Sequence, residues 1–233
     1  MKIKSQNGEH IFVEKIFQKI GVNNKTFVEI GAWPKENNSC SLALQYGFDG
    51  LFIDPCFNNS SNIYDNQKIK FLNDFVTKDN INQLIGSRFE GEIDFLSIDV
   101  DGVDLHLLDS VSVIQPRVIC IEYNASLGPD ISLTVPYRPD FDRGKAPNTW
   151  FCNGSLKATI RIANKLGYDY IGQVFGLNAF FVHKSIGVKP ADIATTWQPH
   201  QARIKTSSEK DQFNQIINLD WINVNEKGLI FDN

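Results

Sequence analysis

The sequence predicts a doubly wound α/β fold with a mostly parallel, Rossmann-like sheet of seven strands. Short apolar runs alternate with amphipathic stretches, which is typical of strands separated by helices. At this spacing, neighbouring strands must be parallel and joined by right-handed crossovers, so both faces of the sheet are covered. The length of 233 residues suits one sizeable domain with elaborations.

The first half of the chain supplies five of the expected strands. An opening helix is expected over 9–20, ended by Gly21, whose backbone freedom suits a helix end. Apolar runs predict strands at 26–30, 50–53, 69–72, 93–98 and 116–121. Helices are expected between them at 39–46, 58–65, 78–87 and 103–111.

The second half begins with a different texture. Residues 125–153 are rich in Pro, Gly and aromatic residues without a period, which predicts an ordered lid loop. A helix over 155–166, ended by Gly167, and two strands at 168–174 and 178–183 should follow. The short connection between these strands predicts an antiparallel pair at the end of the sheet.

The domain boundary is expected near residue 184. Residues 1–184 should form the α/β domain, and residues 185–233 an appended segment with a polar helix near 207–217.

Composition excludes several classes of protein. The formal net charge is −4 and no basic stripe exists, so no nucleic-acid partner is expected. The chain has no long apolar run and no signal-peptide pattern, so a cytoplasmic protein without a membrane partner is expected. The four cysteines form no CxxC pair, which argues against a structural zinc site.

Polar residues follow the first two predicted strands. Ligands of open parallel sheets bind beyond the carboxyl ends of the strands. Gly31 allows a tight turn after the first strand, while Glu29 and Asp54 place acceptors where a ribose or an ammonium group is held. The plainer interpretation makes Glu29 a strand-end residue and Asp54, before Pro55, the start of a turn.

The same loops indicate which cofactor is expected. The fingerprint GxGxxG and the phosphate loop GxxxxGK[ST] are both absent, because the first loop reads GAWPKEN. An acidic residue in this loop would also repel a pyrophosphate. A positively charged cofactor is therefore favoured, and S-adenosylmethionine fits.

Several motifs together carry a family resemblance. In chain order they are SQNGEH, FVEIGAWPKENNS, GLFIDP, FVTKDNIN, IDFLSIDVDGVD, IEYN, NGSLKATIRIANKLGYDYIG and GLNAFFVH. With these motifs the chain resembles the class I S-adenosylmethionine-dependent methyltransferases, in particular the FkbM-like group. Two positions depart from the pattern: the first loop lacks the usual second glycine, and His10 stands where an acid is common.

The resemblance implies roles for individual residues. Glu29 and Gly31 match the cofactor motif of the first strand. Asp54 matches the acid that accepts both ribose hydroxyls, and Asp74 a position that often bonds the adenine amino group, with Asn73 as an alternative.

The stretch IDFLSIDVDGVDLHLL ends a predicted strand with three aspartates. Asp101 and Asp104 are spaced as in a capping box, with Asp101 as the helix N-cap. Asp99 is not explained by a cap, because it directly follows the buried strand. We therefore expect Asp99 to act in cofactor binding, in catalysis and as a metal ligand.

A second polar cluster follows the fifth strand and suggests three alternatives. Neighbouring parallel strands lie about 5 Å apart, so Asp99, Asp101, Glu122 and Asn124 are expected to converge. They would hold Mg²⁺ or another divalent cation, in a way similar in kind to the catechol and macrocin O-methyltransferases. Alternatively, a carboxylate or His106 acts as a metal-free general base, or the cluster is structural.

The resemblance implies methyl transfer to a hydroxyl, less readily an amine, of a small polar acceptor such as a sugar or glycan precursor. Tyr123, Tyr137 and Arg138, in and before the lid, are the candidates for acceptor binding. The alternative function is a non-catalytic S-adenosylmethionine-binding sensor or scaffold. A homo-oligomer is compatible with either function.

Overall fold

The computed structural model describes residues 5–33, 36–56 and 68–229. The chain divides into two compact units. The first unit comprises Met1–Asp99 and Ser110–Cys120, and the second comprises Val100–Asp109 and Ile121–Asn233.

The first unit contains the helices and strands predicted for the first half of the chain. They are α1 (Glu9–Ile20), β1 (Thr26–Ile30), α2 (Cys40–Leu44), β2 (Asp49–Ile53), β3 (Ile69–Leu72), α3 (Ile81–Gly86), β4 (Gly91–Ile98) and most of β5 (Ile114–Glu122). Helix α1 ends at Gly21 as predicted, with a positive φ of 70° and an N–H that donates to the Phe17 carbonyl. The helix predicted at 58–65 lies outside the described residues.

The second unit is richer in short elements. It contains most of α4 (Asp104–Ser110), η2 (Ala125–Leu127), β6 (Leu133–Thr134), η3 (Arg143–Lys145), α5 (Leu156–Lys165), β7 (Tyr168–Val174), β8 (Asn178–His183), η4 (Lys184–Ile186), α6 (Ile193–Thr196), η5 (Arg203–Lys205), α7 (Glu209–Ile216), β9 (Ile222–Asn225) and β10 (Gly228–Leu229). Helices α5 and α7 and strands β7 and β8 confirm the predictions made for these regions. Strands β6, β9 and β10 were not predicted.

Two sheets organise the chain. The larger has seven strands in the order β3-β2-β1-β4-β5-β8-β7, and the smaller has the order β10-β9-β6. Strand β1 pairs in parallel with β2 and with β4, β2 pairs in parallel with β3, and β7 and β8 are antiparallel. The predicted fold class, a mostly parallel sheet ending in an antiparallel pair, is confirmed.

Aromatic side chains fill the core of the first unit. The Phe27 and Phe52 rings meet edge to face with centroids 5.2 Å apart, and the Phe52 and Phe71 rings stack at 5.3 Å. Gly50 on β2 makes room for this packing, because a Cβ atom there would lie 2.1 Å from Cζ of Phe27. The buried residues of β1 and β2 follow one another without alternation, as expected for strands covered on both faces.

A buried carboxylate ties the beginning of β1 to β4 and β5. Asp94 on β4 is fully buried and accepts hydrogen bonds from the backbone N–H groups of Asn23, Asn24 and Lys25. It also pairs with the guanidinium of Arg117 on β5 at 2.7 Å. The charge is therefore both paired and hydrogen-bonded, as a buried charge requires.

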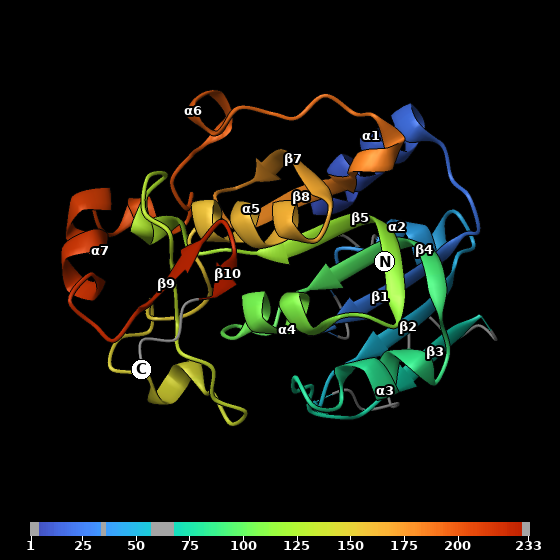
Figure 1. The fold of residues 1–233 in the computed structure, drawn as a ribbon, viewed down its shortest axis with the longest axis horizontal. Coiled ribbons are helices and arrows are strands. Elements are labelled where there is room, and N and C mark those ends of the chain that lie inside the picture. Colours follow the sequence, from blue (N-terminus) through green and yellow to red (C-terminus); the bar gives the residue numbers. More distant parts are fainter. Residues whose placement is uncertain (1–4, 34–35, 57–67, 230–233) are drawn as a thin grey trace. The chain divides into compact units, whose positions relative to one another are not determined.

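Helix α5 is the centre of the second unit. It packs against β7 and against the three strands of the smaller sheet (Figure 1). Its N-cap residue is Ser155, whose hydroxyl accepts from the Ala158 N–H. The same hydroxyl donates to the Ile131 carbonyl, so the cap also anchors the loop that precedes β6.

Three of the four cysteines, Cys40, Cys120 and Cys152, are buried, Cys56 is exposed, and none forms a disulfide. Burial raises the pKa of the Cys152 thiol to about 12, so this side chain is not a nucleophile at neutral pH. Among the described residues, no helix is long and apolar enough to cross a membrane.

Candidate functional site

Three of the predicted site residues lie side by side in the first unit. Gly31, Asp54 and Asp99 directly follow β1, β2 and β4. Each continues the hydrogen bonding of its strand: Gly31 donates to the Ile53 carbonyl, and Asp99 donates to the Ile30 carbonyl, both at 2.9 Å. The three residues therefore share one edge of the sheet, at its carboxyl ends.

This edge lies where the strand order reverses. From β1 the chain continues on one side to β2 and β3, and then returns to the other side to form β4. Open α/β sheets bind ligands in the crevice at such a switch point. Gly31 has a φ of 82°, a conformation that favours glycine, and it turns the chain sharply at this point.

Glu29, the next-to-last residue of β1, is almost fully buried. Its carboxylate accepts from the backbone N–H groups of Asn38 and Ser39, at 2.8 and 2.9 Å, and from the Ser39 hydroxyl. Burial raises the pKa of Glu29 to about 7, against the lowering effect of these hydrogen bonds. The side chain thus holds the start of α2, and its direct contact with a cofactor stays a prediction.

Asp54 is better placed to receive a ligand. It is half-buried, and its Oδ1 accepts from the Cys56 N–H at 2.7 Å. Within 5–33, 36–56 and 68–229, no group donates to its Oδ2. Burial raises the pKa of this carboxyl. Asp74, the predicted adenine partner, follows β3 on an exposed surface.

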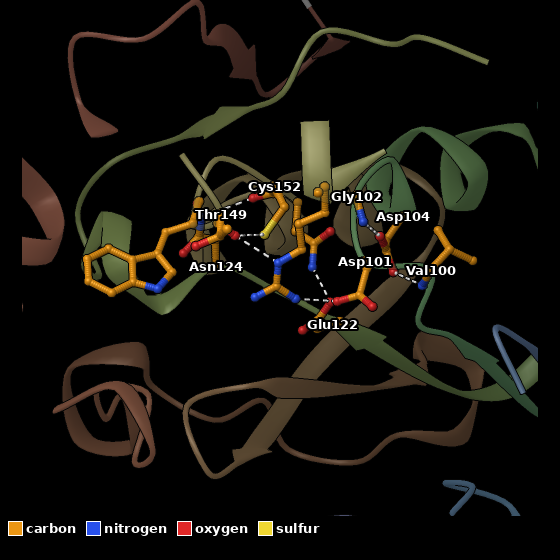
Figure 2. Close-up of polar contacts among 12 residues, drawn as sticks. Val100, Asp101, Gly102, Asp104, Glu122, Asn124, Thr149 and Cys152 are labelled. Carbon is orange, nitrogen blue, oxygen red and sulfur yellow. Dashed lines mark hydrogen bonds and ion pairs between the residues drawn. The ribbon is translucent and has the colours of Figure 1, made fainter. Parts of the chain in front are cut away.

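In the second unit, the turn before α4 is built differently from the predicted capping box. The helix begins at Asp104, and the buried Asp104 carboxylate accepts from the N–H groups of Val100 and Gly102, both at 2.9 Å (Figure 2). Asp101 is exposed, with a φ of 59°, and is not the N-cap. That part of the prediction is wrong, because α4 begins only at Asp104, three residues after Asp101, and the backbone at Asp101 is left-handed.

Asp104 and Glu122 form a buried acid pair. A carboxylate oxygen of each lies within 4.8 Å of the other, and both residues are less than a tenth exposed. Burial, together with the charges of Asp104 and Asp101, raises the pKa of Glu122 to about 8. Burial raises the pKa of Asp104 to about 6. Both carboxyls therefore hold a proton more readily than an exposed acid does.

Asn153 completes this acid pair and was not predicted. Its side-chain amide donates to Glu122, and its backbone N–H donates to the Gly102 carbonyl at 2.8 Å. Asn153 is 1% exposed and has a φ of 57°, which is rare for a residue other than glycine. No hydrogen-bond donor in the described part of the chain reaches its Oδ1. The dipeptide Asn153-Gly154 is a turn signal that could have identified this position.

Arg143 brings a positive charge to the same place. Its Nη1 pairs with Asp101 and its Nε donates to the Thr149 carbonyl at 2.8 Å (Figure 2). Arg143 lies in the predicted lid loop, so this loop is fastened to the turn that carries Asp101 and Asp104. Its sequence neighbours gave no signal for this role.

Asn124, a predicted metal ligand, is fully engaged within the protein. Its Oδ1 accepts from the Ser126 N–H and from Nη1 of Arg203, both at 3.1 Å. Its Nδ2 donates to the carbonyls of Trp150 and Cys152, at 2.6 and 3.0 Å. Both lone pairs of the amide oxygen are used, which disfavours metal binding by Asn124.

The remaining predicted residues are divided between the two units. Asp99 belongs to the first unit, whereas Asp101, Glu122 and Asn124 belong to the second, so a metal site shared by all four stays a prediction. His106 is fully buried on α4, with Nε2 2.7 Å from the Val135 carbonyl and its ring 5.5 Å from that of Tyr137.

Tyr123 and Arg138 differ sharply in exposure. Tyr123 is 1% exposed and packs in the core of the second unit, which disfavours contact with an acceptor. Arg138 is exposed on the loop between β6 and η3.

Comparison with known proteins gave structural likenesses of low identity. No protein-family model and no curated protein matches the chain. A protein described as a hemolysin from Lactococcus lactis is 15% identical, with a TM-score of 0.49 over 78% of this chain and 89% of the other. The N-terminal domain of EvdMO1, crystallised with SAH and D-fucose, is 11% identical, with a TM-score of 0.45 over 76% and 82%. A SAM-dependent methyltransferase from Aquifex aeolicus is 13% identical, with a TM-score of 0.43 over 72% and 87%.

Proposed function

We propose that the chain is an S-adenosylmethionine-dependent methyltransferase that acts on a hydroxyl, less readily an amine, of a small polar acceptor. The observation that carries the proposal is the group Gly31, Asp54 and Asp99 at the switch point of the parallel sheet. The sequence resemblance to class I methyltransferases, in the FkbM-like group, supports the same cofactor.

The residues at this edge fit the cofactor. Gly31, with its φ of 82°, lets the backbone approach a ligand closely. Asp54 has a carboxylate oxygen to which no described residue donates, as expected for an acceptor of ribose hydroxyls. Asp99 adds a negative charge suited to a cationic ligand. We assign Glu29 to the positioning of the first loop, since its oxygens already accept from Asn38 and Ser39.

When bound, S-adenosylmethionine supplies a methyl group on a positively charged sulfur. Methyl transfer breaks the bond from sulfur to carbon and forms the bond from acceptor oxygen to carbon, while the hydroxyl proton must leave. In the metal-free alternative, we assign this proton to the ionised carboxylate of Glu122, which the Asn153 amide holds in the buried acid pair. Alignment of donor and acceptor supplies most of the remaining rate.

In the other alternative, a divalent cation such as Mg²⁺ would be held at the acid pair, with Glu122 as a ligand and not as the base. Asp104 and Glu122 offer oxygens within 4.8 Å of each other, and Asn153 Oδ1 has no donor within the described ranges. Such oxygen ligands fit a hard cation, which would lower the pKa of the acceptor hydroxyl. Asn124 does not fit, because its oxygen already accepts two hydrogen bonds.

The acceptor is proposed to be a sugar or glycan precursor. Tyr137 and Arg138 lie in the loop that leads to Arg143, and they offer a hydroxyl and a guanidinium to polyhydroxylated groups. His106 remains a second candidate base, although its burial and its contact with the Val135 carbonyl favour a structural role.

Cofactor binding is tested by titration calorimetry with S-adenosylmethionine and its demethylated product. Asp54→Asn should weaken binding about tenfold or more, because hydrogen bonds to a charged acceptor contribute about 1.5–3 kcal/mol. Asp49→Asn is the matched control, since Asp49 begins the same strand at its other end. Equal binding by the wild type and Asp54→Asn would contradict the assignment of the ribose site.

Catalysis is tested by methyl transfer to a panel of sugars and sugar nucleotides, with and without Mg²⁺ and EDTA. Glu122→Gln should retain cofactor binding and lose turnover by about 10²-fold or more, as expected for loss of a general base. Turnover that EDTA leaves unchanged would refute the metal. Cofactor binding without turnover on any acceptor would instead favour the sensor or scaffold.

A further inference from the structure

The C-terminal segment, residues 185–229, pairs with the loop that precedes α5 through a β-strand and side-chain hydrogen bonds. Within the second unit, β9 of this segment pairs antiparallel with β6 of the loop, in the register Leu133 with Asn223. The hydroxyl of Ser132 donates to the Val224 carbonyl at 2.7 Å. The segment is therefore an integral part of the second unit and not a loose appendage.

Further along the loop, aromatic and backbone packing adds to this attachment. The Phe151 and Trp221 rings meet edge to face with centroids 4.5 Å apart. The segment also passes directly over the turn between β7 and β8, where a Cβ atom on Gly176 would lie 2.2 Å from the Pro199 carbonyl oxygen. The path of the segment toward η5 is thus closely confined.

On this segment, Arg203 in η5 places its side chain in the interior of the second unit. It is 8% exposed, and its Nη1 donates to Asn124 Oδ1 at 3.1 Å and to the Ser126 hydroxyl at 3.0 Å. The Ser126 hydroxyl donates in turn to Gln212 of α7 at 2.8 Å. Two elements of the segment therefore converge on the residues that follow β5.

From Asn124 the contacts continue to the acid pair. The Asn124 amide holds the carbonyls of Trp150 and Cys152, and these residues immediately precede Asn153. Asn153 binds Glu122 through its side chain and Gly102 through its backbone. The placement of Asn153 against Glu122 therefore depends on Asn124, whose oxygen is oriented by Arg203.

We propose that residues 185–229 are the positioning element of the acid pair, and that Arg203 is the positioning residue through which this segment acts on Asn153 and Glu122. Burying a guanidinium costs desolvation free energy, and apolar side chains of similar volume often stabilise a fold as much. Stability alone therefore does not explain a buried arginine at this position. Its planar, directional donors instead orient the amide of Asn124. The inference rests on the proposed function only in taking Glu122 as a residue of the active site.

The test compares Arg203→Met and Arg203→Lys with Arg161→Met. Arg161 on α5 also contacts the segment, through Glu226 and the Val224 carbonyl, but it does not contact Asn124. Each variant is labelled with ¹⁵N, and the side-chain amide signals of Asn124 and Asn153 are followed for chemical shift and exchange with water. Turnover, cofactor affinity and Tm are measured on the same preparations.

Arg203→Met should shift both amide signals, speed their exchange and lower kcat about 100-fold with unchanged cofactor affinity, because small misplacements have such effects. Arg203→Lys should recover part of both losses, and it carries the amide comparison if Arg203→Met does not fold. Arg161→Met should lower Tm without moving the signals. An unmoved Asn153 signal in the Arg203 variants, or an equal change in Arg161→Met, overturns the proposal. If the wild type shows no turnover, the proposed function fails and the amide signals alone decide.

Discussion

At the residue scale, Asp94 has a buried charge that is paired, within the described part of the chain, with Arg117. Its carboxylate accepts from three backbone N–H groups and from Arg117. Arg117→Met should lower the free energy of unfolding by about 3 kcal/mol, because it leaves a buried carboxylate without its counter-charge. Urea denaturation, followed by circular dichroism, measures the loss.

Arg88→Met is the control for Arg117→Met. Arg88 pairs with Asp49 at the amino end of β2, where both side chains are partly exposed. Exposed pairs contribute about 0–1 kcal/mol, so this variant should lose much less stability. Equal losses in the two variants would show that the burial of Asp94 does not matter.

Residue identity alone could predict some site positions but not their bonding. Asp99 and Asp54 were identifiable because each directly follows a buried apolar run. The spacing of Asp101 and Asp104 suggested a capping box, but the backbone at Asp101 is left-handed and the Asp104 carboxylate instead accepts from Val100 and Gly102 in the turn before α4. Side-chain direction depends on backbone conformation at single residues, and sequence spacing does not specify it.

At the element scale, the two serine N-caps of α5 and α7 differ in how much they hold. Ser155 caps α5 and also bonds the backbone of Ile131 and Leu133. Ser208 caps α7 on an exposed surface. Ser155→Ala should lower the free energy of unfolding by about 2 kcal/mol, and Ser208→Ala by about 1 kcal/mol or less.

Chemical denaturation of the two variants gives this difference directly. Both substitutions remove one hydroxyl from a helix start, so helix propensity affects them alike. Equal losses in Ser155→Ala and Ser208→Ala would mean that the bonds from Ser155 to the loop before β6 add nothing to stability.

The elements that the sequence predicted are those with a continuous pattern of their own. Strands β1 to β5 are apolar runs, and α1 and α5 carry an apolar face, so each was visible in isolation. Strands β6 and β9 are short, and they exist because they pair across about 90 residues of chain. No local pattern specifies such a partner.

The same reason limits the prediction of the acid pair. Glu122 is the last residue of β5 and was identified as a site residue. The residues around Glu122 come from distant loop regions: Asn153 contacts Glu122, Arg143 contacts Asp101, and Arg203 contacts Asn124. Only the tertiary path of these regions brings them together. Loops carry the functional groups that scaffold elements position, so this part of a site is the hardest to infer.

At the scale of the whole molecule, stability should depend on pH in a direction set by buried carboxyls. Burial raises the pKa of Glu29 to about 7 and that of Glu122 to about 8, from the ordinary value of 4.5. Between about pH 4.5 and about pH 8, the folded chain therefore binds more protons than the unfolded chain. Their stabilising contribution is complete below about pH 4.5 and is lost as pH rises through about 7 and 8.

His200 works in the opposite direction at lower pH. Burial and the nearby Arg203 lower its pKa to about 4 from 6.5, so its contribution rises with pH over that interval. The free energy of unfolding should consequently fall most clearly between about pH 6.5 and about pH 8.5. Glu122→Gln should flatten this fall, and Glu209→Gln, on the exposed start of α7, should leave it unchanged. Urea denaturation at several pH values measures both slopes, and a rising slope in the wild type would contradict the prediction.

The hydrogen bond from Arg203 to Asn124 joins residues 79 apart in the sequence. It therefore constrains the order in which parts of the chain can fold during synthesis. Strands β1 to β4 can pair as they leave the ribosome, because their partners are already made. The polar interior of the second unit must wait until Arg203 has been synthesised. Until then Asn124 and Ser126 lack their cation, so a nascent chain stalled before Arg203 would hold a formed sheet and an unfinished acid pair.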